Sequence, residues 1–203
     1  MSHSLKSVSQ MAQETLDNGR AVPKQFTTGP VVPCPFPTIT AATRQAAASY
    51  PDLVAAIDLS QTVRREISYA QLEVRARWLA QRLRRAGVGP GDRVPLVVKR
   101  SIEMLIGIYA ILLCGAQYVP LDGGIVTEAT LQTVILQSGG RLVVCTASAK
   151  GRLQQTDSEI VRGCRVLCVE DEVGHGDEAV DPIDLATPES GCYVIYTSGS
   201  YGT

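Results

Sequence analysis

A stretch rich in hydroxyls and glycines, residues 197–203, holds the side chains of this sequence best suited to chemistry. It follows Tyr193-Val-Ile-Tyr196, whose aromatic and β-branched residues predict a short buried strand. Glycines let backbone N–H groups approach an anion, and hydroxyls can donate to phosphate oxygens. The candidate phosphate ligands are Thr197, Ser198, Gly199, Ser200, Gly202 and Thr203. The competing interpretation is a polar turn that follows a strand.

Other chemistry is poorly supported by the residues. The glycine-rich stretch is not a P-loop of the Walker type, because no Gly-Lys-Ser/Thr follows at the required spacing. Cys164 and Cys168 are four residues apart with no second pair or nearby His, which favours buried thiols over a metal site. His175 lies in an acidic loop and also lacks a partner at metal spacing. We therefore predict no metal ligands and no catalytic residue in this chain.

Composition limits the class of protein. The chain has 203 residues, of which 45% are hydrophobic, enough for the core of one domain or of a large piece of one. The net charge of −1 gives no indication of a nucleic-acid partner, and the arginines of segment 72–86 are expected on a solvated helix face. The uncharged run Met104–Leu121 is interrupted by Gly115 and Pro120, which favours a buried helix, turn and strand over a membrane span.

The N-terminal segment is expected to be an arm, and the rest of the chain a domain. Residues 1–24 are polar and lack the apolar core of a signal peptide, and prolines then punctuate the sequence up to Pro37. We expect a flexible or extended arm over 1–37, a domain over 38–203, and a cytoplasmic location without a membrane partner. The domain is expected to begin with a helix from Thr38 or Thr40 to Tyr50.

Strand and helix patterns alternate through this domain. Val54–Leu59 and Arg65–Tyr69 predict a hairpin at the edge of a sheet. Ser68 is placed as the N-cap of a helix that Gly87 ends. The apolar face of that helix consists of Leu72, Ala76, Leu79, Ala80, Leu83 and Ala86. The unbroken apolar run Val94–Val98 predicts a strand that is buried on both faces of a parallel sheet.

Three further strands are expected after helices. A helix capped by Ser101 and ended by Gly115 leads into a strand at Tyr118–Leu121. The later predicted helices are 128–137 and 153–161, and the strands that follow them are Arg141–Thr146 and Arg165–Val169. This alternation predicts an α/β fold with a mainly parallel sheet and flanking helices. Ligands of such sheets bind at the carboxyl ends of strands, where the turn after Tyr196 would lie.

The stretch through Gly202 resembles the phosphate-binding signature of the adenylate-forming (AMP-binding) superfamily, which runs aromatic-Thr-Ser-Gly-Ser/Thr-Thr-Gly and continues into Pro-Lys-Gly. Residues 38–203 also carry, in order, segments similar to landmarks of the adenylation domains of nonribosomal peptide synthetases. These are Ile67-Ser-Tyr-Ala-Gln-Leu72, Gly87-Val-Gly-Pro-Gly-Asp-Arg93, Arg100-Ser-Ile-Glu-Met104 and Leu113-Cys-Gly-Ala-Gln-Tyr-Val-Pro-Leu-Asp122. Two positions depart from the pattern: Tyr201 stands where the family has Thr, and Gly123-Gly124 where it continues with Pro.

The resemblance implies the incomplete N-terminal subdomain of an adenylate-forming enzyme. Such an enzyme uses Mg2+ and ATP to convert a carboxylic acid into an acyl-adenylate, and passes the acyl group to a phosphopantetheine or coenzyme A thiol. The implied partners are a small carboxylate substrate and a carrier-protein domain. The resemblance assigns the six candidate ligands of 197–203 to the β- and γ-phosphates of ATP, and it places the other functional residues of the family beyond Thr203.

Two classes of function stay open. In the first, the chain is the N-terminal piece of an adenylating ligase and is inactive alone; in the second, it is a catalytically inactive remnant that acts at most as a nucleotide-binding or protein-interaction module. An unrelated dinucleotide-binding dehydrogenase is disfavoured, because no Gly-x-Gly-x-x-Gly follows the first strand. The strand Tyr193–Tyr196 is expected to leave an apolar edge uncovered, so that the chain alone associates.

Overall fold

The computed structural model describes residues 32–60, 62–139, 141–171 and 183–196. The chain divides into two units, Met1–Pro35 and Phe36–Thr203, and every element given below belongs to the second. Most of the expected N-terminal arm, His175 with the loop around it, and the glycine-rich stretch 197–203 lie outside the described residues. The division into 1–37 and 38–203 stays a prediction.

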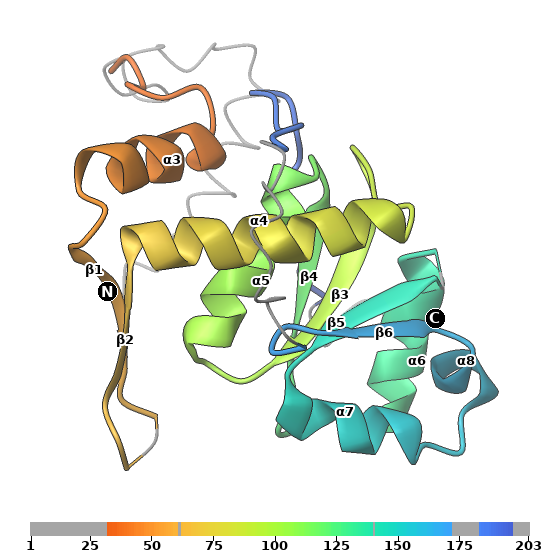
Figure 1. The fold of residues 1–203 in the computed structure, drawn as a ribbon. Helices are drawn as coiled ribbons and strands as arrows, with labels where there is room; N and C mark the ends of the chain where they lie inside the picture. Colours follow the sequence, from red (N-terminus) through yellow and green to blue (C-terminus); the bar gives the residue numbers. More distant parts are fainter. Residues whose placement is uncertain (1–31, 61, 140, 172–182, 197–203) are drawn as a thin grey trace, which may run out of the picture. The chain divides into compact units, whose positions relative to one another are not determined.

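A four-stranded parallel sheet forms the centre of the second unit (Figure 1). Its strands are β3 (Arg93–Val98), β4 (Gln117–Asp122), β5 (Leu142–Cys145) and β6 (Arg165–Cys168), in the order β4-β3-β5-β6. All three neighbouring pairs are parallel. Because parallel neighbours need crossover connections, a helix lies between each strand and the next in sequence. The predicted α/β fold class is confirmed.

Strand β3 shows why an unbroken apolar run suits a central parallel strand. Residues 94–98 are all buried. Val94, Leu96 and Val98 pack into one core cluster, whereas Val97 packs into a second cluster on the opposite face. Each face of the sheet therefore has its own core, and helices cover both.

Two long helices cover the first face. Helix α4 (Tyr69–Arg85) begins with a capping box, in which Gln71 N donates to Ser68 Oγ and Ser68 N donates to Gln71 Oε1. Gly87 follows its C-terminus with φ of +92°, which only glycine adopts readily. Helix α5 (Ile102–Leu113) is buried along most of its length. The predicted caps Ser68 and Ser101 are both confirmed.

Shorter helices cover the second face: α6 (Glu128–Gln137), α7 (Ala147–Gln154) and α8 (Glu159–Arg162) (Figure 1). The single helix predicted over 153–161 is wrong, because α7 begins earlier and the chain turns between α7 and α8. The turn forms because Ser158 caps α8: its Oγ accepts from Val161 N at 3.3 Å. No helix in the described part of the chain is long and apolar enough to cross a membrane.

The hairpin before α4 forms a sheet of its own. Strands β1 (Val54–Asp58) and β2 (Arg65–Ser68) pair in antiparallel register, with an irregularity near the start of β1. The predicted hairpin is confirmed, but it is not an edge of the central sheet. Helix α3 (Ile39–Ser49) precedes it and is capped by Thr38, as predicted.

Candidate functional site

The described residues just before the glycine-rich stretch run beside β4. Tyr193 forms a parallel bridge with Tyr118. Tyr118 N donates to Cys192 O at 3.2 Å, and Val194 N donates to Tyr118 O at 3.0 Å. The two tyrosine rings lie with their centroids 5.7 Å apart. Because the bridge is parallel, the chain passes it in the direction of the edge where β4 ends, and this is the edge at which open α/β sheets bind ligands.

The prediction of a buried strand at Tyr193–Tyr196 is wrong in part. The segment makes a single bridge rather than a strand, and the side chains of Tyr193 and Ile195 are 54% and 60% exposed. The physical reason is its position: among the described residues, no strand pairs with its outer side. The exposed side chains agree with the expectation of an uncovered apolar edge, while association of the chain stays a prediction.

The six predicted phosphate ligands, Thr197, Ser198, Gly199, Ser200, Gly202 and Thr203, lie outside the described residues. The structure does describe the carboxyl edge of the sheet, toward which the chain runs before residue 197. At that edge β3 is followed by Lys99, β4 by Gly123, β5 by Thr146 and β6 by Val169.

The turn after β4 is closely packed against the residue after β3. Gly123 N donates to Val98 O at 3.0 Å, and Gly124 N donates to Asp122 Oδ1 at 2.7 Å. A Cβ on Gly124 would lie 2.8 Å from Cε of Lys99, so the flexible Lys99 side chain would have to move away. The absence of a side chain at 124 therefore lets the Lys99 stem lie against this turn. Lys99 and Asp122 at the carboxyl edge were not singled out from the sequence; the charged residue at the end of the apolar runs of β3 and β4 is the signal that could have found them.

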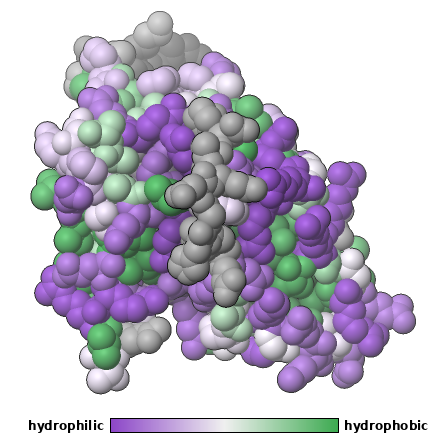
Figure 2. Space-filling view, viewed as in Figure 1, coloured by the Kyte–Doolittle hydropathy of each residue, from purple (hydrophilic) through white to green (hydrophobic). Residues whose placement is uncertain are grey.

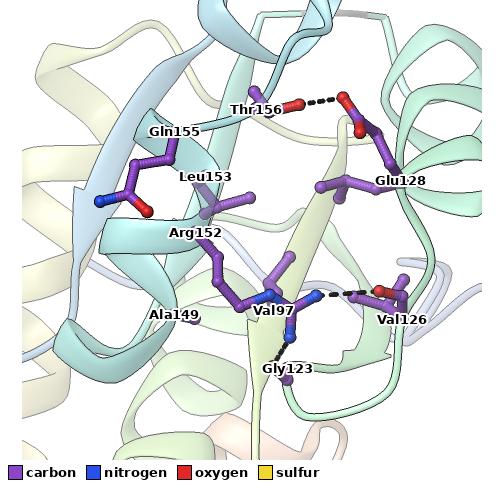
Figure 3. Close-up of a pocket in the computed structure, with 10 residues that line it drawn as sticks. Val97, Gly123, Val126, Glu128, Ala149, Arg152, Leu153, Gln155 and Thr156 are labelled. Carbon is purple, nitrogen blue, oxygen red and sulfur yellow. Dashed lines mark hydrogen bonds between the residues drawn. The ribbon is translucent and has the colours of Figure 1, made fainter.

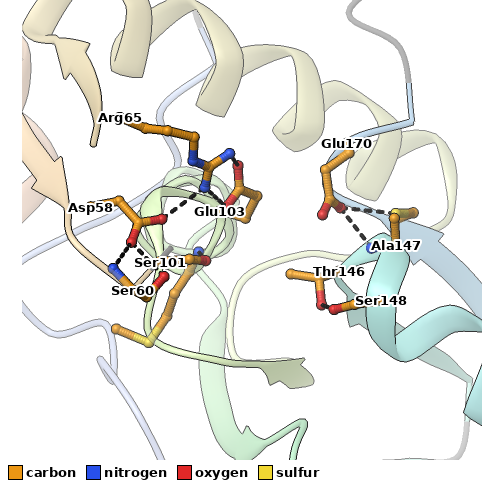
Figure 4. A network of polar contacts seen from close by, with 11 residues as sticks. Asp58, Ser60, Arg65, Ser101, Glu103, Thr146, Ala147, Ser148 and Glu170 are labelled. Carbon is orange, nitrogen blue, oxygen red and sulfur yellow. Dashed lines mark hydrogen bonds and ion pairs between the residues drawn. The ribbon is translucent and has the colours of Figure 1, made fainter. Parts of the chain in front are cut away.

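The ends of β5 and β6 hold a second polar group, drawn in Figure 4. Glu170 Oε2 accepts from Ala147 N at 2.9 Å and from Cys168 Sγ at 3.0 Å. Burial and the hydrogen bond to Glu170 raise the pKa of Cys168 to about 11. Cys145, its register partner on β5, has a pKa raised to about 12 by burial. Both thiols are buried in the core, as predicted for Cys168, and their raised pKa values keep them protonated at neutral pH. Within the described residues no group of three or more His, Cys, Asp or Glu could hold a metal.

A cavity of about 280 Å3 opens on the second face, near the carboxyl ends of β3 and β4 (Figure 3). Val97, Leu131 and Leu153 form part of its apolar lining. The Arg152 guanidinium reaches from α7 to the turn after β4, where it donates to Gly123 O at 2.7 Å and to Val126 O at 2.9 Å. These contacts fix the wall of the cavity by hydrogen bonds to backbone carbonyls.

An ion-pair network on the other side of the sheet joins the hairpin to α5, also shown in Figure 4. Arg65 Nη2 lies 2.8 Å from Asp58 Oδ2 and 2.8 Å from Glu103 Oε2. The hydrogen bond from Arg65 and those from Ser60 hold the pKa of Asp58 well below its usual value. Burial alone would raise the pKa of Glu103, but hydrogen bonds from Arg65, the backbone and Ser101 lower it overall. This network joins the hairpin to α5.

Comparison with known proteins decides the family. The family described as AMP-binding enzyme matches residues 43–203, which is most of the chain. The chain belongs to the AMP-binding enzyme family. The resemblance inferred from the motifs is thereby confirmed.

Relatives of this AMP-binding family member are much longer proteins. It is 34% identical over 184 residues to adenylate-forming reductase 03009 of Coprinopsis cinerea, covering 91% of this chain and 17% of the relative. It is 35% identical over 153 residues to zwittermicin A synthase ZmaJ of Bacillus cereus, covering 75% of this chain and 27% of the relative. The chain thus spans less than a third of the length of either relative.

Solved structures show the same fold. The AMPPNP-bound form of the nonribosomal peptide synthetase FmoA3 matches with a TM-score of 0.70 at 24% identity, over 85% of this chain and 18% of that one. The inhibitor-bound N-terminal domain of FACL13 from Mycobacterium tuberculosis matches with a TM-score of 0.64 at 23% identity, over 81% and 42%. The parallel α/β unit of this chain is therefore that of the N-terminal part of adenylate-forming enzymes.

Proposed function

We propose that this chain is the nucleotide-phosphate-binding part of an AMP-dependent ligase that activates an amino, aryl or fatty acid as its acyl-adenylate. The observation that supports the proposal most directly is the parallel bridge between Tyr118 and Tyr193. It directs the chain toward the carboxyl edge of the sheet as it enters 197–203. That edge is the usual ligand side of an open parallel sheet.

In this proposal the residues of 197–203 bind the β- and γ-phosphates of ATP. Backbone N–H groups at Gly199 and Gly202 donate to phosphate oxygens, and the hydroxyls of Thr197, Ser198, Ser200 and Thr203 add donors. Donors already oriented toward the phosphates stabilise the charge that moves onto the leaving pyrophosphate. The side chain of Lys99, at the same edge, adds a positive charge to this region.

The proposed reaction has two steps. A carboxylate oxygen of the substrate attacks the α-phosphorus of ATP, a P–O bond forms, and the bond to the leaving pyrophosphate breaks. A phosphopantetheine or coenzyme A thiolate then attacks the acyl carbon, so that a thioester forms and AMP leaves. The described residues supply no acidic cluster for Mg2+. We propose that residues of a longer protein hold the Mg2+ that neutralises phosphate charge, together with the carboxylate and the carrier domain.

The second candidate function is a catalytically inactive module that binds nucleotide or another protein. Tyr201 favours it, because a bulky phenol stands where the family signature has the Thr hydroxyl. The transcript sequence beyond the codon for Thr203 distinguishes the two candidate functions. An in-frame continuation into Pro-Lys-Gly or a close variant supports the ligase, whereas a stop codon at that point supports the module.

Activity of the 203-residue chain is a second test. We expect no carboxylate-dependent exchange of labelled pyrophosphate into ATP, because 197–203 alone supplies too few contacts to the transition state. Exchange by the purified chain would contradict this expectation. Nucleotide binding, measured by titration calorimetry, is expected to persist in Tyr201→Thr and to weaken in Gly199→Val, whose side chain would obstruct the approach of the backbone to phosphate. Equal binding by wild type and Gly199→Val would count against a phosphate role for 197–203.

A further inference from the structure

The opposite, amino edge of the central sheet carries arginines without carboxylate partners. Arg93 begins β3, Arg141 directly precedes β5, and Arg165 begins β6. All three are exposed. None of their side chains makes an ion pair or a hydrogen bond with any part of the chain that the structure describes. In Figure 2 hydrophilic residues dominate the surface around the end of α4, which packs beside this edge.

Arg93 and Arg141 lie level with each other. The register pairs Leu96 with Val144, so that each arginine stands three residues before the paired residue of its own strand. Like charges on neighbouring strands repel and destabilise a sheet. An anion bound between the two arginines would offset their mutual repulsion.

A cavity of about 180 Å3 lies at this place, between the starts of β3 and β5 and the turns that end α4 and α6. Arg93 and Arg141 both line it. Ser138 also lines it, and its Oγ is buried without a hydrogen-bond partner among the described residues. A buried hydroxyl without a partner is costly, because it has lost water and gained nothing in exchange. An oxyanion in the cavity would supply the missing acceptor.

Two neighbouring charges have other partners. Arg84 Nη1 donates to Val88 O at 2.8 Å, so this arginine is bound to the backbone of the turn that follows α4. Asp92 lines the cavity, but its Oδ2 accepts from Gly89 N at 2.8 Å. Arg93 and Arg141 differ from Arg84, since neither donates to a carbonyl among the described residues. Stabilisation of a helix end therefore does not account for them.

We propose that Arg93, Arg141 and Ser138 form a binding site for a compact oxyanion of the phosphate class. A guanidinium presents two parallel N–H donors that fit two phosphate oxygens. The Ser138 hydroxyl donates to a third. This site lies at the edge opposite to the proposed nucleotide-phosphate site and does not depend on it.

Titration calorimetry with inorganic phosphate, at constant ionic strength, tests the proposal on the 203-residue chain. R93Q/R141Q is expected to weaken phosphate binding by at least about tenfold, because it removes both charge-assisted donors. Arg75→Gln, at a half-buried arginine of α4 that does not line this cavity, is the charge control and is expected to leave binding unchanged. Because 197–203 is itself proposed to bind phosphate, R93Q/R141Q is also compared in a Gly199→Val background, where it is expected to weaken phosphate binding just as much. Phosphate binding that R93Q/R141Q leaves unchanged in the Gly199→Val background overturns the proposal, as does a wild-type chain that binds no phosphate.

Ser138→Ala provides an independent test that does not rest on the arginines. It is expected to weaken phosphate binding several-fold while the urea midpoint without phosphate stays equal or rises, because an unpartnered buried hydroxyl is removed. R93Q/R141Q is likewise expected to keep or raise that midpoint, since repulsion is relieved. A lower midpoint in Ser138→Ala together with unchanged phosphate binding would show that the hydroxyl is structural, and would overturn its place in the site.

Discussion

The two faces of the parallel sheet are covered in different ways. On the first face the long helices α4 and α5 pack into the core cluster that contains Leu83 and Leu96, both fully buried. On the second face the short helices α6, α7 and α8 pack over a smaller cluster that contains Leu131 and Leu153, and the cavity of about 280 Å3 opens there. The first face therefore has the larger core, and the core of the second face borders a cavity.

The polar contacts that hold neighbouring elements together also differ between the two faces. On the first face, Arg65 holds the hairpin to α5 through the carboxylates of Asp58 and Glu103. On the second, Arg152 holds α7 to the turn after β4 through two backbone carbonyls. The first contact depends on the ionisation of acids, and the second does not. Acid should therefore loosen the hairpin before it loosens the wall of the cavity.

The largest expected difference concerns one leucine on each face. We expect Leu83→Ala to lower the free energy of unfolding by about 3–4 kcal/mol, since a fully buried side chain leaves a void that well-packed neighbours cannot fill. We expect Leu153→Ala to cost only about 2 kcal/mol, since one side of this leucine already borders the cavity and loses fewer contacts. Urea denaturation of both variants measures the difference. Equal losses would mean that the second face is packed as well as the first.

The Arg65 ion pairs and the Arg152 hydrogen bonds should respond differently to pH. Glu103 has a pKa below its ordinary value of 4.5 in the folded chain, so its contribution is present above about pH 4.5 and is lost as the pH falls through the folded value. We expect Glu103→Gln to lower the free energy of unfolding by about 1–2 kcal/mol at neutral pH. The difference from wild type should shrink as the pH falls below 4.5, and disappear once the pH is below the folded pKa of Glu103.

Arg152→Met is the matched variant on the second face. Its cost should be similar, about 1–2 kcal/mol, and constant from neutral pH to about pH 3, since Arg stays protonated and carbonyls do not titrate. Urea midpoints at several pH values measure both series. The contrast between the two sets of contacts would be wrong if the stability lost in Arg152→Met declined with acid, or if the stability lost in Glu103→Gln did not.

The features that the sequence predicts well are those that depend on residues close together in the chain. The apolar run of β3 and the capped, amphipathic α4 follow from local pattern, and both occur as expected. The break between α7 and α8 was missed because the cap Ser158 competes with a helical continuation that the apolar spacing also allows. The exposure of Tyr193 was missed because burial of a strand depends on its neighbours in the sheet, which no local pattern reports. The register that sets Arg93 beside Arg141 is likewise a property of the assembled sheet.

The smallest expected effect is a gain of stability on the second face. Ala149 is buried on α7 and lines the cavity. We expect Ala149→Leu to raise the free energy of unfolding by about 0.5–1 kcal/mol, because the larger side chain fills space that is now empty and leucine is nearly as good a helix former as alanine. Ala147→Leu, at an exposed position of the same helix, controls for helix propensity and should change little. If Ala149→Leu destabilises the chain while Ala147→Leu does not, the cavity has walls too rigid to accept added volume, and the second face is as tightly constrained as the first.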